Sequence, residues 1–188
     1  MEIEHLTNEV SNILSKADPI MLTQMDSVSL QNRIDRKYIL HQSRLPGILQ
    51  ALKDDYYVLE IGEHRIFSYR TVYYDTPDFQ FFKDHHNGLT NRIKVRCRQY
   101  VETNDTFFEI KRKYQGTRTD KYRKHIDGFF NSLGEEEYSA IKCRYQKHEI
   151  NDLKLSLKNF FFRITLVSKK LTERATVDFG ISFSNDTT

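Results

Sequence analysis

The chain has 188 residues, enough for one domain with a substantial apolar core, and its net charge of +3 is too small to make nucleic acid the default partner. The aromatic residues are 11 tyrosines and 13 phenylalanines with no tryptophan, which is typical of a sheet-rich protein. Cys97 and Cys143 lie too far apart in the sequence for a metal or redox motif, which indicates a reducing compartment, and we expect a cytoplasmic protein. We also expect no membrane segment, because no apolar run reaches the ~20 residues that cross a bilayer.

The N-terminal third predicts helices first and strands later. Apolar residues at helical spacing predict an amphipathic helix over 2–16 that ends before Asp18 and Pro19, so we divide the chain into an N-terminal helix, 1–18, and a domain, 19–188. Residues 32–40 alternate as in a strand, and Ser43 is the expected N-cap of a helix over 44–53. Residues 56–74 predict two strands around a turn at Gly62 and Glu63.

The remaining two thirds predict mostly strands. A turn at Asp75 is expected to cap a short helix, and Asn87-Gly88 is a turn signal before a hairpin over 91–113. Further strands are expected at 120–126, 160–167 and 173–183, and a helix at 134–144. Lys142, Arg144 and Lys147 are interpreted as a solvated helix end.

The hairpin over 91–113 separates charged from apolar side chains. Alternation places Arg92, Lys94, Arg96 and Arg98 on one face of the first strand, and Glu109, Lys111 and Lys113 on one face of the second. The opposite face is apolar and includes Ile93, Val95, Cys97, Phe108 and Ile110. Because like charges that face each other across strands destabilise a sheet, an anion is expected between them. A simply solvated cationic face is the alternative.

The same alternation recurs in segments 33–37, 92–98, 109–113, 121–125 and 174–178. This recurrence favours an α+β fold in which an antiparallel β tunnel or barrel has a charged interior and an apolar outside covered by helices. The reverse arrangement, with the cations outside, leaves the helices little to pack on. A closed interior with so few carboxylates must hold water or a polyanion, because unpaired buried ions cost several kcal/mol each. A linear chain of phosphates suits such a lining, since arginine binds phosphate through a planar fork.

Several motifs resemble those of the polyphosphate polymerase domain of the vacuolar transporter chaperone (VTC) family, a branch of the triphosphate tunnel metalloenzymes. The matching pieces are Arg33-x-Asp-x-Lys-Tyr38, Val72-Tyr-Tyr-Asp-Thr76, Asn91-Arg-x-Lys-Val-Arg-x-Arg98 with Tyr100, Phe108-Glu-Ile-Lys111, Lys121-x-Arg123 and Arg174-x-Thr-x-Asp-x-Gly180. The resemblance implies an eight-stranded basic tunnel, the triphosphate tunnel fold. It also implies transfer of the γ-phosphate of a nucleoside triphosphate to a polyphosphate chain, with Mn²⁺ or Mg²⁺ as cofactor.

The resemblance assigns roles to individual residues. The implied catalytic residues are Lys37, Arg96, Arg98, Lys111, Arg163 and Arg174; the implied substrate-binding residues are Arg33, Lys94, Lys121 and Arg123; and the implied metal ligands are Glu109 and Asp178. The family has further strands after the one that holds Arg174, and this chain ends at Thr188 without them. A tunnel open on one side, strands supplied by another chain in a homo-oligomer, and a truncated chain are the three alternatives.

Four functions are compatible with these patterns. The first is a polyphosphate polymerase that uses a nucleoside triphosphate and polyphosphate as partners. A non-catalytic sensor of polyphosphate or nucleotide is the second, and a tripolyphosphate hydrolase is the third. A nucleic-acid binder is the least favoured, because it needs exposed cations with aromatic stacking platforms.

Overall fold

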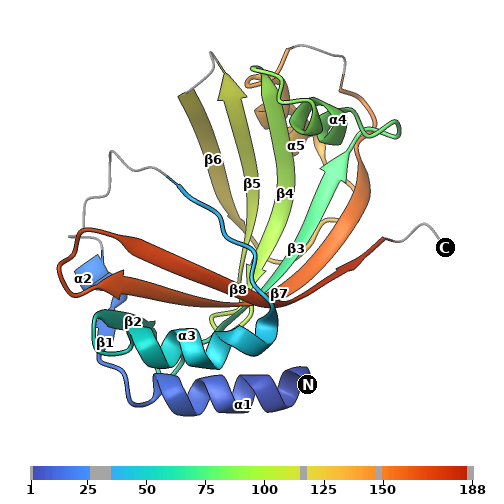
Figure 1. Ribbon diagram of the computed structural model, residues 1–188. Coiled ribbons are helices and arrows are strands. Elements are labelled where there is room, and N and C mark those ends of the chain that lie inside the picture. The colour runs from blue at the N-terminus through green and yellow to red at the C-terminus, as the bar shows by residue number, and fades with distance from the viewer. Residues whose placement is uncertain (1, 26–34, 115–117, 147–149, 186–188) are drawn as a thin grey trace. The chain divides into compact units, whose positions relative to one another are not determined.

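The structure is a computed structural model that describes residues 2–25, 35–114, 118–146 and 150–185 (Figure 1). The helices are α1 (Ile3–Leu14), α2 (Leu22–Met25), the 3-10 helix η1 (Gln42–Arg44), α3 (Leu45–Leu52), α4 (Gln80–His86) and α5 (Glu135–Lys142). The strands are β1 (Pro19–Met21), β2 (Tyr56–Glu60), β3 (Phe67–Asp75), β4 (Arg92–Tyr100), β5 (Asp105–Tyr114), β6 (Arg118–Ile126), β7 (Lys154–Ser168) and β8 (Arg174–Ser184). The α+β class predicted from the sequence is confirmed.

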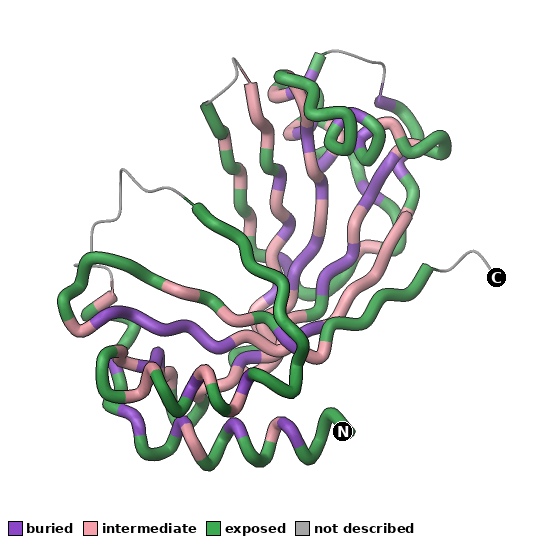
Figure 2. Tube along the Cα trace, in the orientation of Figure 1, coloured by how far each residue is buried: buried purple, intermediate pink, exposed green. Residues whose placement is uncertain are grey.

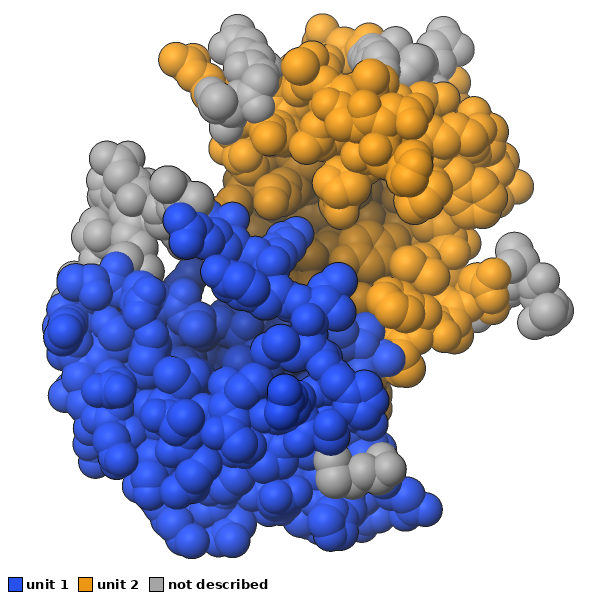
Figure 3. Space-filling view, viewed as in Figure 1, with its two compact units in different colours: residues 1–67, 161–181 blue, residues 68–160, 182–188 orange. Residues whose placement is uncertain are grey.

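The chain forms two compact units (Figure 3). Unit 1 comprises residues 1–67 and 161–181, and unit 2 comprises residues 68–160 and 182–188. In unit 1, β1 pairs with β2 in parallel, β2 pairs with β7 in antiparallel fashion, and β8 also pairs with β7. Leu6, Val10 and Leu14 of α1 are buried in a core with Leu49 of α3 and Ile164 of β7. The helix predicted over 2–16 is therefore part of the packed core of this unit.

Unit 2 contains the predicted hairpin. Its strands are ordered β7-β3-β4-β5-β6, and the β3–β4, β4–β5 and β5–β6 pairs are antiparallel. Buried residues alternate with half-buried ones along β4 (Figure 2). The hairpin turn has Asn104 in the left-handed region with φ of 56°, a conformation that asparagine tolerates better than most residues. The turns predicted at Gly62 and Gly88 are also confirmed, since both glycines have positive φ.

The turn at Asp75 caps α4 as predicted. Asp75 accepts hydrogen bonds from the backbone N–H groups of Phe81 (2.8 Å) and Phe82 (2.9 Å), and a third from Thr76 (2.8 Å). Burial raises the pKa of the Asp75 carboxyl, although these three donors act in the opposite direction. The carboxylate thus satisfies N–H groups at the helix start that have no partner within the helix.

Two predictions for the N-terminal third are wrong. No strand forms in residues 35–40, where Tyr38, Ile39 and Leu40 are exposed and Ile39 is 99% accessible. Alternating sequence alone does not make a strand, because the backbone must also find a neighbouring strand to pair with. Residues 32–34 of the predicted strand lie outside the described residues. Ser43 is not an N-cap either: it lies inside η1, whose first residue follows His41, and the His41 ring accepts the Ser43 N–H.

Candidate functional site

Three neighbouring strands of unit 2 bring most of the predicted site residues onto one surface. In antiparallel strands, directly opposite side chains lie about 4.5–5.5 Å apart at Cβ and project to the same face. The rungs across β4, β5 and β6 are Lys94–Lys111–Lys121, Arg96–Glu109–Arg123 and Arg98–Phe107–His125. We call the surface formed by these three rungs the cationic face.

The opposite surface of the same strands is apolar and is covered by helices. Ile93, Val95 and Ile110 are each 1% exposed and belong to one core with Phe81 of α4 and Ile141 of α5. The orientation predicted from the alternation is therefore confirmed within unit 2. The helices hold the apolar side, and the charged side chains point the other way.

Glu109 neutralises the middle rung of the cationic face. Its Oε2 accepts a hydrogen bond from Arg96 Nε at 2.7 Å and lies 2.6 Å from Arg96 Nη2, while its Oε1 lies 3.4 Å from Arg123 Nε. Burial lowers the pKa of Arg96, but the attraction of Glu109 and Tyr73 outweighs burial, so the net shift is upward. The contact of Glu109 with Arg96 is shorter than its contact with Arg123. It is also less accessible to solvent, because the Arg96 side chain is 28% exposed and that of Arg123 is 47% exposed.

Arg98 is the most enclosed cation of the face, at 8% exposure. Its Nε donates to Thr71 Oγ1 at 3.1 Å, and its guanidinium lies 5.4 Å from the ring centre of Tyr69. Burial lowers the pKa of Arg98, and the neighbouring positive charge of Arg96 lowers it further. An anion placed between Arg96 and Arg98 would offset the repulsion between the two guanidinium groups.

The lysine rung places three ammonium groups in line across the strands. Lys94 is half-buried, whereas Lys111 and Lys121 are exposed. Directly opposed like charges cost up to about 1 kcal/mol per pair relative to neutral side chains, and the cost falls with solvent screening. An anion that contacts several of these lysines at once would remove that repulsion.

Aromatic rings gather at the other end of the face. Tyr100 lies edge-to-face with Tyr69 at 5.0 Å and with Phe107 at 5.8 Å, and Phe107 lies 5.2 Å from the His125 ring. The guanidinium of Arg123 lies 3.5 Å from the ring centre of Phe107. The rings hold this arginine in place by cation–π attraction, beside the carboxylate of Glu109.

Comparison with known proteins now identifies the family. The model of the VTC domain matches residues 32–186, most of the chain. The chain belongs to the VTC domain family. This membership confirms the resemblance described from the motifs, and the VTC domain points to a polyphosphate-related function. No curated protein matches the chain in sequence.

Among solved structures, the chain is similar to the PH1819 protein from Pyrococcus horikoshii OT3, with a TM-score of 0.42 and 15% sequence identity. That similarity covers 72% of this chain and 68% of the PH1819 chain. Within the part of the VTC chain that the structure describes, no helix is both long and apolar enough to span a membrane.

The remaining predicted site residues of the VTC domain lie in unit 1. Arg163 forms a bidentate ion pair with Asp178, with nitrogen–oxygen distances of 2.6 and 2.7 Å. Arg174 is exposed on β8, and Lys37 is exposed in a segment that forms no strand. Arg33 lies outside the described residues.

The predicted metal ligands are both bound to arginines. Glu109 contacts Arg96 and Arg123, and both oxygens of Asp178 contact Arg163. Within residues 2–25, 35–114, 118–146 and 150–185, no three acidic, histidine or cysteine side chains are placed to hold a metal. Hard cations need several oxygen ligands, and an arginine-bound carboxylate must first give up its ion pair. The described residues therefore do not fit a Mn²⁺ or Mg²⁺ site built by the VTC domain alone.

The sequence analysis missed the contribution of β3. Thr71 and Tyr73 lie opposite Arg98 and Arg96 in the β3–β4 ladder and so extend two rungs of the cationic face by one strand, and Tyr69 lies opposite Tyr100 on the same side. The signal was available, because these three residues alternate with Val72 and Tyr74 of the buried core. The sequence analysis predicted only strands over 56–74, since Tyr and Thr carry no charge that would mark a binding face.

Proposed function

We propose that the cationic face binds the phosphate chain of polyphosphate and of a nucleoside triphosphate. One observation carries the proposal: the register of β4, β5 and β6 aligns six lysine and arginine side chains in three consecutive rungs that hold a single carboxylate, Glu109. Membership of the VTC family agrees with this ligand class.

The geometry of the face favours a long phosphate chain over a single phosphate. Rungs on the same face are two residues apart along a strand, which is about 6.8 Å. A linear polyphosphate carries charge all along its length and can contact successive rungs, whereas orthophosphate contacts one. Arginine offers two parallel N–H donors to phosphate oxygens, whereas lysine offers a compact charge. The arginine-containing rungs and the lysine rung therefore bind phosphate in different ways.

The finer proposal is transfer of the γ-phosphate to polyphosphate. A terminal oxygen of the polyphosphate would attack the γ-phosphorus, and the bond to the β–γ bridging oxygen would break, releasing nucleoside diphosphate. Such a reaction needs positioning and charge neutralisation more than covalent work by the protein. Arg96, Lys94 and Lys111 would supply the charge neutralisation. No step is assigned to Glu109 as a metal ligand, because arginines hold it.

Binding is tested with Arg96→Gln and a matched control, Arg70→Gln. Arg70 is an exposed arginine of β3 that alternates with Tyr69 and Thr71, so its side chain projects to the face opposite the rungs. We expect Arg96→Gln to weaken tripolyphosphate binding about ten- to a hundred-fold, the effect of one lost charge-assisted contact, and Arg70→Gln to change it little. Isothermal titration and thermal shifts measure the effect. Equal losses in both variants, or equal stabilisation by single-stranded RNA of matched charge, would contradict the proposal.

Catalysis is tested separately, with ATP and polyphosphate in the presence of Mn²⁺ or Mg²⁺. Chain growth with release of ADP indicates a polymerase. Release of orthophosphate from tripolyphosphate indicates a hydrolase, and tight binding with neither product indicates a sensor. Whichever product is found, the binding proposal is tested separately by the titration of Arg96→Gln and Arg70→Gln.

A further inference from the structure

A second cationic site lies in unit 2, away from the cationic face. It is a cavity of about 340 Å³ lined by Asn91, Arg112, Cys143, Arg144 and Gln146. Arg112 alternates along β5 with Lys111 and Lys113 and follows the buried Ile110 by two residues. Its side chain therefore projects from the helix-covered side of the sheet, opposite the lysine rung.

Arg112 is held in place from two sides. Its Nε donates to Asn91 Oδ1 at 3.2 Å, and its guanidinium lies 4.9 Å from the ring centre of Tyr114. Both partners restrict the orientation of the planar fork. An arginine that is already oriented loses less conformational freedom when an anion binds.

Arg144 reaches the same cavity from the turn that follows α5. Its guanidinium lies 4.4 Å from the ring centre of Tyr122, and its Nη1 donates to the Ala140 carbonyl at 2.9 Å. Its Nε is buried and lies 3.3 Å from Asp120 Oδ2, but this contact lacks hydrogen-bond geometry and no other partner exists among the described residues. Buried donors of this kind nearly always have an acceptor, and an anion oxygen bound in the cavity would supply one to this N–H.

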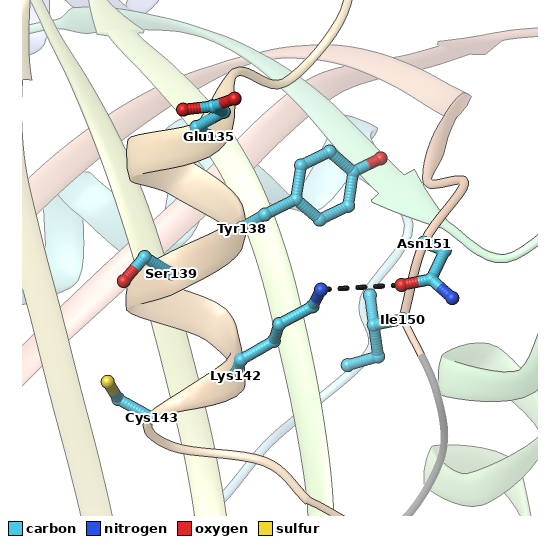
Figure 4. A pocket seen from close by; sticks show the side chains of 7 residues that line it. All are labelled: Glu135, Tyr138, Ser139, Lys142, Cys143, Ile150 and Asn151. Atoms are coloured by element: carbon cyan, nitrogen blue, oxygen red, sulfur yellow. Dashed lines mark hydrogen bonds between the residues drawn. The ribbon is translucent and has the colours of Figure 1, made fainter.

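The charge of this cavity differs from that of another cavity in unit 2. Among the described residues named here, the charges of Arg112 and Arg144 are offset by one carboxylate, that of Asp120, which leaves a net positive charge. The other cavity, which also has Cys143 in its lining, is shown in Figure 4. It is lined by Lys142 and the acidic Glu135 among others, and Lys142 donates to Asn151. The arginine pair therefore distinguishes the first cavity as an anion site.

We propose that the cavity lined by Arg112 and Arg144 binds a compact phosphate oxyanion, orthophosphate or pyrophosphate, independently of the cationic face. Two forked donors and two amides converge on a space suited to a small ligand. A long phosphate chain suits the successive rungs of the cationic face, whereas a short anion suits two arginines that line one small cavity.

The test is a titration of the ¹⁵N-labelled chain with orthophosphate and, in a second arm, pyrophosphate, at constant ionic strength set with chloride. We expect saturable amide shifts at Asn91, Arg112 and Gln146. Arg112→Gln and Arg144→Gln should each weaken orthophosphate binding about ten-fold or more, because each removes a charge-assisted fork. Lys142→Gln removes one positive charge from the last turn of α5 and should leave binding unchanged. Arg96→Gln acts on the cationic face and should leave the orthophosphate-dependent shifts at Asn91 and Gln146 unchanged.

Cys143 supplies a second readout, because it is exposed and lines the cavity. Orthophosphate should slow its alkylation in the wild-type chain and not in Arg144→Gln. Arg112→Lys keeps the charge without the fork and should fall between wild type and Arg112→Gln, and each variant is checked for an unchanged melting temperature. Absence of saturable shifts in the wild type, or an orthophosphate affinity lost in Arg96→Gln but kept in Arg112→Gln, would overturn the proposal. Because polyphosphate binding is measured on the same variants, loss at one site is distinguished from loss at the other.

Discussion

Replacement of Glu109 by glutamine tests the electrostatic design of the cationic face. The substitution keeps the shape of the side chain and removes the only carboxylate of the three rungs, all of whose residues are described. A charge-assisted hydrogen bond such as that between Glu109 and Arg96 contributes about 1.5–3 kcal/mol. Since Arg96 is 28% exposed and Arg123 is 47% exposed, solvent screening reduces the expected loss to about 1–2 kcal/mol.

Such a loss lowers the melting temperature by about 2–8 °C for a chain of this size. Differential scanning fluorimetry measures it, with Glu63→Gln as the control because Glu63 is an exposed residue in a turn. The effect of tripolyphosphate should go in the opposite direction. Without the carboxylate that repels it, the polyanion should stabilise Glu109→Gln by at least as much as it stabilises the wild type.

A Glu109→Gln variant that melts like the wild type would show that the ion pairs with Arg96 and Arg123 do not stabilise the fold. A weakened response to tripolyphosphate, seen only when Mn²⁺ or Mg²⁺ is present, would show instead that Glu109 is a metal ligand. Either result would refute the reasoning that Glu109 serves to neutralise its own rung.

Three further predictions concern the packing of each unit. Gly180→Ala should destabilise the chain by about 1–3 kcal/mol in urea unfolding, because Gly180 has φ of 59° and a Cβ there would lie 2.8 Å from Ile3 Cδ1. The control is Gly47→Ala, which should not destabilise the chain because its Cβ would meet nothing within 4 Å. Iodoacetamide should label exposed Cys143 and leave buried Cys97 unmodified until the chain unfolds, as mass spectrometry would show; two adducts on the native chain would contradict this. Burial raises the pKa of Cys97 and of Tyr74 above their ordinary values of 9.0 and 10.0, so the folded state keeps these protons longer than the unfolded chain. Stability should therefore be unaffected by these groups below pH 9 and fall as the pH rises beyond it, and Tyr74→Phe should make the fall shallower.

The sequence by itself determined which side chains share a face. The period of two along 92–98 and 109–113 separates Lys94 and Arg96 from Ile93 and Val95 in any strand, because successive side chains point to opposite sides. The caps and turns at Asp75, Gly62 and Gly88 were also predictable, since they depend on local backbone conformation. The α+β class followed from these local signals together.

Only the tertiary structure decided which charges meet. The pairing of Glu109 with Arg96 on one side and Arg123 on the other depends on the register of three strands, which alternation does not specify. The strand predicted at 32–40 does not form in its described part, 35–40, for a related reason. Alternation determines which side chains share a face, but it does not provide a neighbouring strand for hydrogen bonding. Arg144 was interpreted as part of a solvated helix end, yet it is half-buried against Tyr122 and close to Arg112. Contacts between residues so far apart in the chain arise from packing of α5 on the sheet, and packing is decided by the whole fold rather than by neighbouring residues.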